Sequence, residues 1–430
     1  MLHSQIHRKT LANGIVAIAI GNPSTDIMAA RFFSRGGSRY DPTPGTGNLM
    51  ASAITKGTAN LSSMEIAERA ESVGASLGTD VTSDYFLANL KTVSSDFGEM
   101  LALTSEILRE PSFPAAEVEL EKRLTLQSIR SQREQPFSVA FSELRSAMYG
   151  QHPYALSTLG TEDDVATLVP QDLHRYHRAY LRPDNLIVTL VGCIEPDRAI
   201  ALLEETFGDW EASGLPTDLP PLPAPNTEPR RVGLAQDTQQ SIVMLGYSAP
   251  SVLAPAHPDE PDEYAALKLL NTYLGNGLSS RLFVELREKR GLAYDVSAFF
   301  PTRVDLSQFV AYIGTAPANT EVALDGLQAE LDRLVARPLD PEELETSKRK
   351  LLGQYALGKQ TNAQIAQILG WYETIGLGTD FDERFPEAIE AVTVEAAQET
   401  ARKYFSGTPY ISVVGPEAAI EPVLGAAAVG

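Results

Sequence analysis

The chain contains one order of segments twice, and this repeat limits its fold more than any other feature. Residues 172–192, DLHRYHRAYLRPDNLIVTLVG, predict a helix, a turn and a buried strand that ends in glycine. Residues 394–415, VEAAQETARKYFSGTPYISVVG, predict the same three elements. The final glycines, Gly192 and Gly415, lie 223 residues apart, and a tyrosine in each helix repeats at 224. Matching segments in one register indicate a tandem duplication.

A proline-rich stretch separates the two copies. Residues 211–231, EASGLPTDLPPLPAPNTEPRR, contain six prolines and predict an extended, semi-rigid linker. Charged helical segments at 117–129 and 342–357 each follow a proline, which adds a second matched pair. We therefore expect an N-terminal domain at 1–210, the linker, and a C-terminal domain at 232–430.

Each half combines strands with blocks of helices. This order favours an α+β class, with two homologous domains that each form a mixed, mostly antiparallel sheet with helices packed on it. Helices are predicted at 63–73 and 96–109. The predicted strands are 14–20, 27–34, 86–91 and 186–191 in the first half, and 242–247, 294–300, 309–315 and 410–414 in the second.

Composition excludes several classes of partner. The formal net charge of −21 argues against nucleic acid and against anionic membranes. The single cysteine, Cys193, excludes an internal disulfide and is consistent with a reducing compartment. The N-terminus has no apolar stretch typical of a signal peptide, and no segment is long enough to span a bilayer. A cytoplasmic location is expected.

Histidines are scarce, and only one pair has ligand spacing. His174 and His177 lie one helical turn apart and could share a metal. No cysteine neighbours them, and Asp172 resembles a helix start, so a solvated helix face is the favoured interpretation. The sequence contains no Walker-type phosphate loop, no G-x-S-x-G and no H-E-x-x-H motif.

The most distinctive pattern in the sequence is the segment at 275–300, GNGLSSRLFVELREKRGLAYDVSAFF. It predicts an amphipathic helix that ends at Gly291 and is followed by a strand. Arg287 lies on the helix and Tyr294 at the start of the strand, and the chain reverses between them. Both side chains could therefore reach one point. The alternative is an ordinary surface arginine and a half-buried tyrosine.

The run 277–294 resembles the hallmark of the pitrilysin, insulinase and mitochondrial processing peptidase family, the inverted zincins. The His-Pro-Tyr at 152–154, the Gly-Thr at 160–161 and the Arg-Pro-Asp-Asn turn at 182–185 agree with it. The resemblance covers almost the whole chain. The length is similar to that of the small two-domain bacterial members, which work as dimers.

In that family an H-x-x-E-H run, followed by Lys-Gly-Thr, holds zinc and the general base. Aligned on the Lys-Gly-Thr at 56–58, the two histidine positions fall on Asn48 and Ser52, and the glutamate position falls on Ala51. A further glutamate ligand would fall near Ser128, where Gln127 and Ser128 replace carboxylates. The resemblance thus implies a degenerate zinc motif and no metal in this chain.

The same resemblance implies that Arg287 and Tyr294 bind the carbonyl and the developing oxyanion of a peptide substrate. We expect a zinc-free subunit of a heterodimeric metallopeptidase, inactive alone, whose homologous partner carries H-x-x-E-H and the zinc. Peptide would bind as an added strand. The alternative is a non-catalytic scaffold or peptide-binding homodimer, similar to the core proteins of the respiratory cytochrome b–c complex. A third interpretation, an unfamiliar enzyme site in this chain, has only the two spare histidines in its favour.

Overall fold

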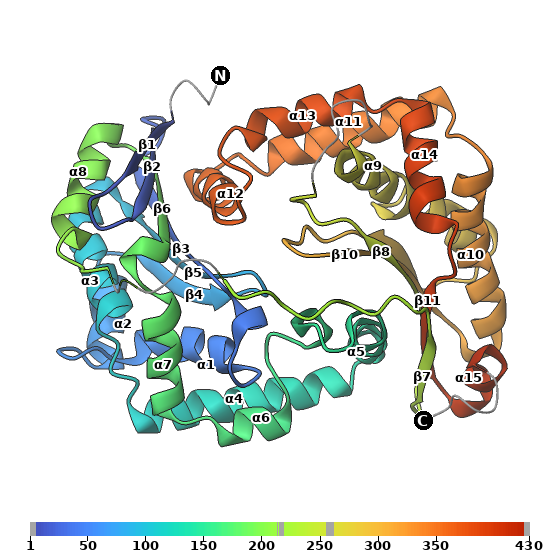
Figure 1. The fold of residues 1–430 in the computed structure, drawn as a ribbon, viewed down its shortest axis with the longest axis horizontal. Coiled ribbons are helices and arrows are strands. Elements are labelled where there is room, and N and C mark those ends of the chain that lie inside the picture. The colour runs from blue at the N-terminus through green and yellow to red at the C-terminus, as the bar shows by residue number, and fades with distance from the viewer. Residues whose placement is uncertain (1–5, 213, 215–218, 255–261, 425–430) are drawn as a thin grey trace. The chain divides into compact units, whose positions relative to one another are not determined.

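The computed structural model describes residues 6–212, 214, 219–254 and 262–424. The chain forms two compact units, each assembled from three stretches (Figure 1). Unit 1 comprises Met1–Ile129, Ser157–Pro221 and Ala356–Glu383, and unit 2 comprises Arg130–Leu156, Leu222–Tyr355 and Arg384–Gly430. Of the predicted linker, residues 213 and 215–218 lie outside the described residues, and the described remainder up to residue 230 forms neither helix nor strand.

Unit 1 contains a six-stranded sheet in the order β1-β2-β6-β3-β5-β4. Only β2 and β6 run parallel, and the other neighbours are antiparallel. The strands are β1 (His7–Thr10), β2 (Val16–Gly21), β3 (Ile27–Arg35), β4 (Ser76–Val81), β5 (Tyr85–Val93) and β6 (Leu186–Gly192).

Unit 2 contains a five-stranded sheet in the order β7-β11-β8-β10-β9. Only β7 and β11 run parallel. The strands are β7 (Arg231–Ala235), β8 (Ser241–Ala249), β9 (Asp295–Phe299), β10 (Ser307–Thr315) and β11 (Tyr410–Gly415). Without β1 the two sheets have the same order and the same directions, so the predicted duplicated α+β fold is confirmed.

One face of each sheet is covered by helices that lie mostly between its strands in the sequence (Figure 1). In unit 1 the helices are α1 (Thr46–Ala53), α2 (Ser63–Ser72), α3 (Phe97–Arg109), α6 (Glu162–Thr167), α7 (Pro170–Tyr180), α8 (Pro196–Phe207) and most of α4 (Ala115–Arg133), whose last turn belongs to unit 2. In unit 2 they are α9 (Glu263–Gly275), a π-helix (Phe283–Lys289), α10 (Thr320–Ala336), α11 (Pro341–Leu357), α14 (Val394–Phe405) and α15 (Glu417–Leu424), while α13 (Phe381–Ala391) begins in unit 1 and continues in unit 2.

The opposite face of each sheet is covered by a helix from the other half of the sequence. Helix α5 (Pro136–Tyr149) packs Ala140 and Leu144 against β8 and β11 of unit 2. Helix α12 (Asn362–Thr374) packs Leu369 against β2 and β6 of unit 1. The predicted halves follow the repeat, whereas the compact units cross that division because each half supplies one helix to the other.

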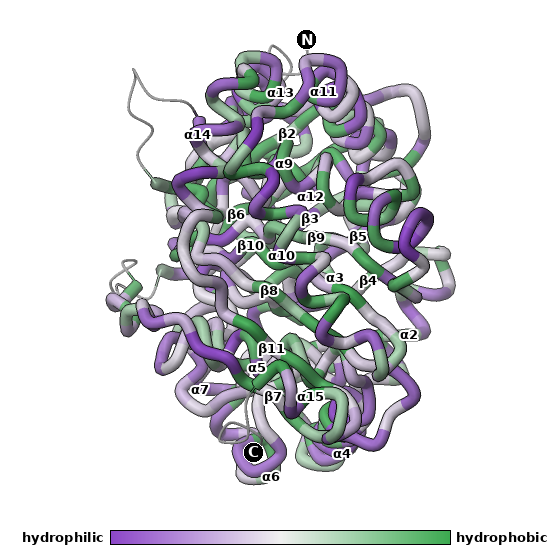
Figure 2. The backbone as a smooth tube through the Cα atoms, turned by 90° about the vertical axis from the view of Figure 1, so that its right-hand side faces the viewer, coloured by the Kyte–Doolittle hydropathy of each residue, from purple (hydrophilic) through white to green (hydrophobic). Residues whose placement is uncertain are grey.

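Burial explains the apolar runs in the sequence. Strands β6 and β11 are buried along their whole length, and β8 and β11 are coloured mainly as hydrophobic segments in Figure 2. A strand covered by helices on both faces needs apolar residues at successive positions rather than alternate ones. Among the helices of the described residues, none is both long and apolar enough to cross a membrane.

Candidate functional site

Helix α1 carries three of the four positions aligned with the zinc site. It follows Gly45, whose φ of 92° lies in the left-handed region. Asp41 accepts hydrogen bonds from the main-chain N–H groups of Gly45 and Gly47, at 2.9 and 3.0 Å. Burial nevertheless raises the pKa of the Asp41 carboxyl to about 8. The start of the helix is therefore held by a buried, protonatable capping group.

The three α1 positions have ordinary structural roles. Ser52 Oγ donates to the carbonyl oxygen of Asn48, one turn back, at 3.0 Å. Ala51 is 3% exposed and belongs to the main apolar core of unit 1. Thr79 of the edge strand β4 donates to the Ala51 carbonyl at 2.7 Å. The position that the resemblance assigns to the general base thus holds a side chain of the apolar core.

The fourth position, Ser128, lies on the exposed face of α4. Its hydroxyl donates back to the carbonyl oxygen of Leu124 at 3.0 Å. Lys56, just beyond α1, forms an ion pair of 3.0 Å with Glu121 of α4. The end of the α1 segment therefore lies beside α4 at Glu121.

These residues do not fit a zinc ion. Protein zinc sites are built from cysteine, histidine and carboxylate ligands, whereas these positions offer an amide, a methyl group and two hydroxyls. Across the part of the chain that the structure describes, no three His, Cys, Asp or Glu side chains are grouped so that they could hold a metal ion.

The predicted helix that carries Arg287 is a π-helix over Phe283–Lys289. It ends at Gly291, whose φ is 62°, and Leu292 N–H donates to the Leu286 carbonyl at 2.8 Å. The ending at Gly291 is confirmed, but the α-helical expectation is wrong for these seven residues. Short π-helical segments occur frequently at functional sites, where they change the direction of a side chain.

Arg287 and Arg290 are the two exposed arginines of this segment that form no ion pair with a described residue. Glu285 accepts from Arg281 at 2.9 Å and from Lys289 at 2.8 Å, and Arg281 also reaches Glu330 at 2.7 Å. The exposed Arg287 guanidinium lies 4.9 Å from the ring centroid of Phe283 and makes no hydrogen bond or ion pair with any described residue.

Tyr294 lies immediately before the edge strand β9 and is 60% exposed. Its main-chain N–H donates to the Gly314 carbonyl at 2.8 Å, which fixes the backbone beside β10. Its phenol makes no hydrogen bond with any described residue. Tyr294 is therefore not the half-buried tyrosine of the alternative interpretation, and its hydroxyl can bind a ligand.

A polar cavity of about 650 Å³ lies behind the π-helix. Residues of α9, the π-helix, α10 and α11 line it, among them Lys350. Lys350 Nζ donates to the carbonyl oxygen of Asn276 and to Ser279 Oγ, and so holds the loop that precedes the π-helix. Lys350 could not be identified from the sequence, because its contacts join segments more than 70 residues apart and leave no local pattern.

The histidine pair is not a solvated helix face. His177 is 6% exposed, and its Nε2 lies 2.8 Å from the carbonyl oxygen of Leu108, near the end of α3. His174 is half-buried and packs edge-on against Phe113 at 4.9 Å. Burial lowers the pKa of His177 to about 4, so its ring is neutral near pH 7. The predicted solvated helix face is therefore wrong for His177. Carbonyl groups in the last turn of a helix lack partners within that helix, and the buried His177 ring lies beside such a carbonyl, that of Leu108 in α3.

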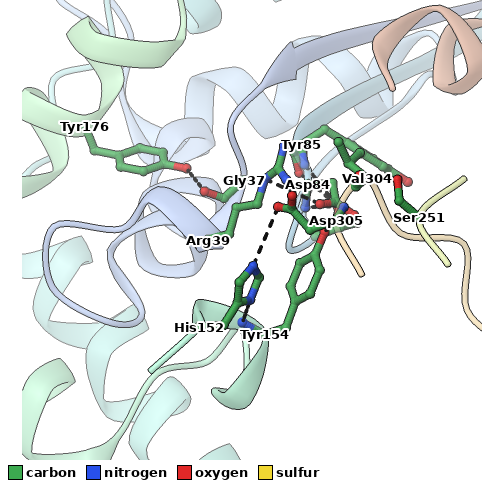
Figure 3. A network of polar contacts seen from close by, with 11 residues as sticks. Gly37, Arg39, Asp84, Tyr85, His152, Tyr154, Tyr176, Ser251, Val304 and Asp305 are labelled. Carbon is green, nitrogen blue, oxygen red and sulfur yellow. Dashed lines mark hydrogen bonds and ion pairs between the residues drawn. The ribbon is translucent and has the colours of Figure 1, made fainter. Parts of the chain in front are cut away.

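The His-Pro-Tyr run forms a turn in unit 2 (Figure 3). His152 Nδ1 accepts from the main-chain N–H of Tyr154 at 3.1 Å. His152 Nε2 lies 3.6 Å from Asp305 Oδ2. The histidine is 2% exposed, so this part of the family pattern has a structural role.

Comparison with known proteins shows the family to which the chain belongs. Residues 16–162 match the family model described as "Insulinase (Peptidase family M16)", and residues 167–351 match "Peptidase M16 inactive domain". The chain is 27% identical over 421 residues to the uncharacterized zinc protease YmxG of Bacillus subtilis, which covers 96% of this chain and 98% of that protein. An uncharacterized zinc protease of Streptomyces coelicolor is 26% identical over 423 residues, covering 96% and 90%.

Solved structures show the same fold. A peptidase M16 inactive domain from Pseudomonas fluorescens superposes with a TM-score of 0.87 at 25% identity, covering 96% of this chain and 98% of that one. A protease from Helicobacter pylori gives 0.88 at 20% identity, covering 96% and 99%. The two family models together span most of the sequence, and the chain belongs to peptidase family M16.

Proposed function

We propose that this chain is the zinc-free subunit of a heterodimeric M16 peptidase. It supplies Arg287 and Tyr294 to the substrate, while a homologous partner with H-x-x-E-H holds the zinc and hydrolyses the peptide. The observation that carries this proposal is the state of Arg287. The neighbouring cations Arg281 and Lys289 are paired with Glu285, whereas the exposed Arg287 guanidinium, like that of Arg290, forms no ion pair with a described residue.

The chemistry of the pair suits an oxyanion. Hydrolysis of a peptide bond places negative charge on the carbonyl oxygen, and a positioned donor stabilises that charge by about 3–4 kcal/mol in a dry site. A guanidinium and a phenol each carry a polar hydrogen, so each can donate a hydrogen bond to that oxygen. Tyr294 is 60% exposed, so its hydroxyl is accessible to such an oxygen.

The sheets also offer a way to bind peptide. Strands β4 and β9 lie at the ends of their sheets, so each has one edge without a neighbouring strand in its sheet. An extended peptide adds to such an edge through main-chain hydrogen bonds. Tyr294 directly precedes β9, and Thr79 links β4 to α1. The net charge of −21 favours basic peptides through long-range attraction.

The test is co-expression with a family member that carries H-x-x-E-H. We expect no peptide cleavage by this chain alone and cleavage by the pair. Arg287→Ala should lower kcat of the pair by about 10²-fold or more, whereas Arg337→Ala, at an exposed arginine in unit 2, should not change it. Activity of the isolated chain, or full activity of the Arg287→Ala pair, would contradict the proposal.

A scaffold or peptide-binding homodimer is the competing function. Static light scattering separates the two: a homodimer that persists unchanged when the zinc-bearing homologue is added favours the scaffold. A mass that shifts to one copy of each chain favours the peptidase subunit.

A further inference from the structure

Two arginines of unit 2, Arg145 and Arg303, contact the same turn, at Leu156 and Tyr154. Arg145 lies on α5, and Arg303 lies in the loop between β9 and β10. Within the described residues, neither guanidinium forms an ion pair. Arg145 Nη1 donates to the carbonyl oxygen of Leu156 at 3.0 Å, and the Nε atoms of both arginines are buried without a hydrogen-bond partner.

Both arginines lie against aromatic rings of the apolar cluster that α5 forms with the sheet of unit 2. The Arg145 guanidinium lies 4.9 Å from the ring centroid of Phe141, and the Arg303 guanidinium lies 4.5 Å from that of Tyr154. Tyr149, one turn after Arg145 on α5, packs edge-on against Tyr154 at 5.5 Å. These contacts hold both cations on one aromatic cluster, where their positions are fixed by packing.

The pair carries two like charges at neutral pH. Burial, with a smaller contribution from the positive charge of Arg303, lowers the pKa of Arg145 to about 10, which still leaves it protonated. A desolvated guanidinium beside a second cation is costly when neither forms an ion pair, because burial removes the water that would otherwise solvate the charge. The chain has 56 acidic and 35 basic residues, so carboxylates are abundant elsewhere in it.

A third unsatisfied group lies on the same side of the sheet. Gln308 of β10 is 1% exposed, and neither polar atom of its side-chain amide forms a hydrogen bond with a residue that the structure describes. Because side chains alternate along a strand, Gln308 faces the same side as Val310, which packs in the cluster with α5. An uncharged donor is thus buried on the sheet face that α5 covers.

We propose that Arg145 and Arg303, assisted by Gln308, form a binding site for an oxyanion, either a carboxylate or a phosphate group. Guanidinium groups bind both through paired N–H···O bonds, and two held by packing lose little freedom on binding. The bound anion compensates the two cations. This site lies outside the Arg287 and Tyr294 pair and does not depend on the proposed peptidase function.

The test uses the full chain and two probes, inorganic phosphate and succinate, against sodium chloride at equal ionic strength and pH. We expect at least one oxyanion to raise the midpoint of thermal unfolding by about 2 °C or more in the parent. The shift should persist in Arg337→Gln, an exposed control, and be lost in Arg303→Gln. The probe that raises the unfolding midpoint, phosphate or succinate, shows whether the site binds a phosphate or a carboxylate group.

Two results would overturn the proposal. One is a parent that responds equally to chloride, phosphate and succinate. The other is a thermal shift that both Arg303→Gln and Arg145→Lys retain. The lysine keeps the positive charge and a donor toward Leu156 but lacks the paired N–H donors of a guanidinium. Arg303→Gln should melt in chloride at or above the parent temperature, because it removes the repulsion. A fall of more than about 3 °C there would give Arg303 a structural role instead.

Discussion

Thr79 Oγ1 donates a hydrogen bond of 2.7 Å to the carbonyl oxygen of Ala51. This bond joins the edge strand β4 to α1 at the position where the family alignment places the general base. Ala51 is part of the apolar core of unit 1, and Ser52 is bonded within its own helix. The position that the resemblance assigns to the general base is therefore packed in a way that suits a small apolar residue.

Ala51→Glu should destabilise unit 1, because the new carboxylate would lie in the core without a partner. We expect a loss of roughly 2–4 kcal/mol in the free energy of unfolding, measured by urea denaturation. Met64→Glu adds the same carboxylate to α2 at a position that is 78% exposed, and should be nearly neutral. Equal stabilities of the two variants would show that position 51 still has room for a base.

Tyr294→Phe should separate function from stability. The hydroxyl makes no hydrogen bond with the described residues and the ring is 60% exposed, so the unfolding midpoint should not change. In the complex with a zinc-bearing partner, loss of one oxyanion donor should lower kcat by about 10²–10³-fold. A decrease in peptide affinity at constant kcat would instead assign the hydroxyl to ground-state binding.

The strands that the sequence predicts best are those buried on both faces. The predicted strands 186–191 and 410–414 lie within β6 and β11. A short continuous apolar run is typical of a strand that is buried on both faces and is too short for most buried helices. Strands β1 and β7 were not predicted, since their residues are largely exposed and carry no apolar pattern. Edge strands of this kind exist only through pairing with a neighbour that is distant in sequence.

The sequence identified Arg287 and Tyr294 as candidate site residues, but it did not predict the backbone conformation around them. The run that contains Arg287 has the apolar stripe of an ordinary helix, so the π-helix is invisible to a pattern of 3.6 residues per turn. The role of His177 was missed because its acceptor, Leu108, belongs to another helix. Both differences come from tertiary contacts, which local propensity does not contain.

His177 should make stability depend on pH. Its pKa in the folded chain is about 4, below the ordinary value of about 6.5, so the unfolded chain takes up the proton first as the pH falls. The stabilisation is complete above pH 6.5 and is lost as the pH falls through 4. The difference in unfolding free energy between the parent and His177→Phe should therefore shrink by about 3 kcal/mol from pH 7 to pH 4. Parallel curves would contradict a buried neutral histidine.

Gly370 of α12 provides a test of whether this helix is part of unit 1. A Cβ at this position would lie 2.4 Å from Phe33 Cε2 and 2.6 Å from Thr189 Oγ1, on β3 and β6. Gly353 of α11 is the matched control, since a Cβ there meets no atom within 4 Å. Gly353→Ala should stabilise the chain by about 0.5–1 kcal/mol through helix propensity. Gly370→Ala should lose about 1–3 kcal/mol despite the same gain, with faster hydrogen exchange in β3 and β6. A gain in both variants would mean that α12 does not pack on the sheet of unit 1.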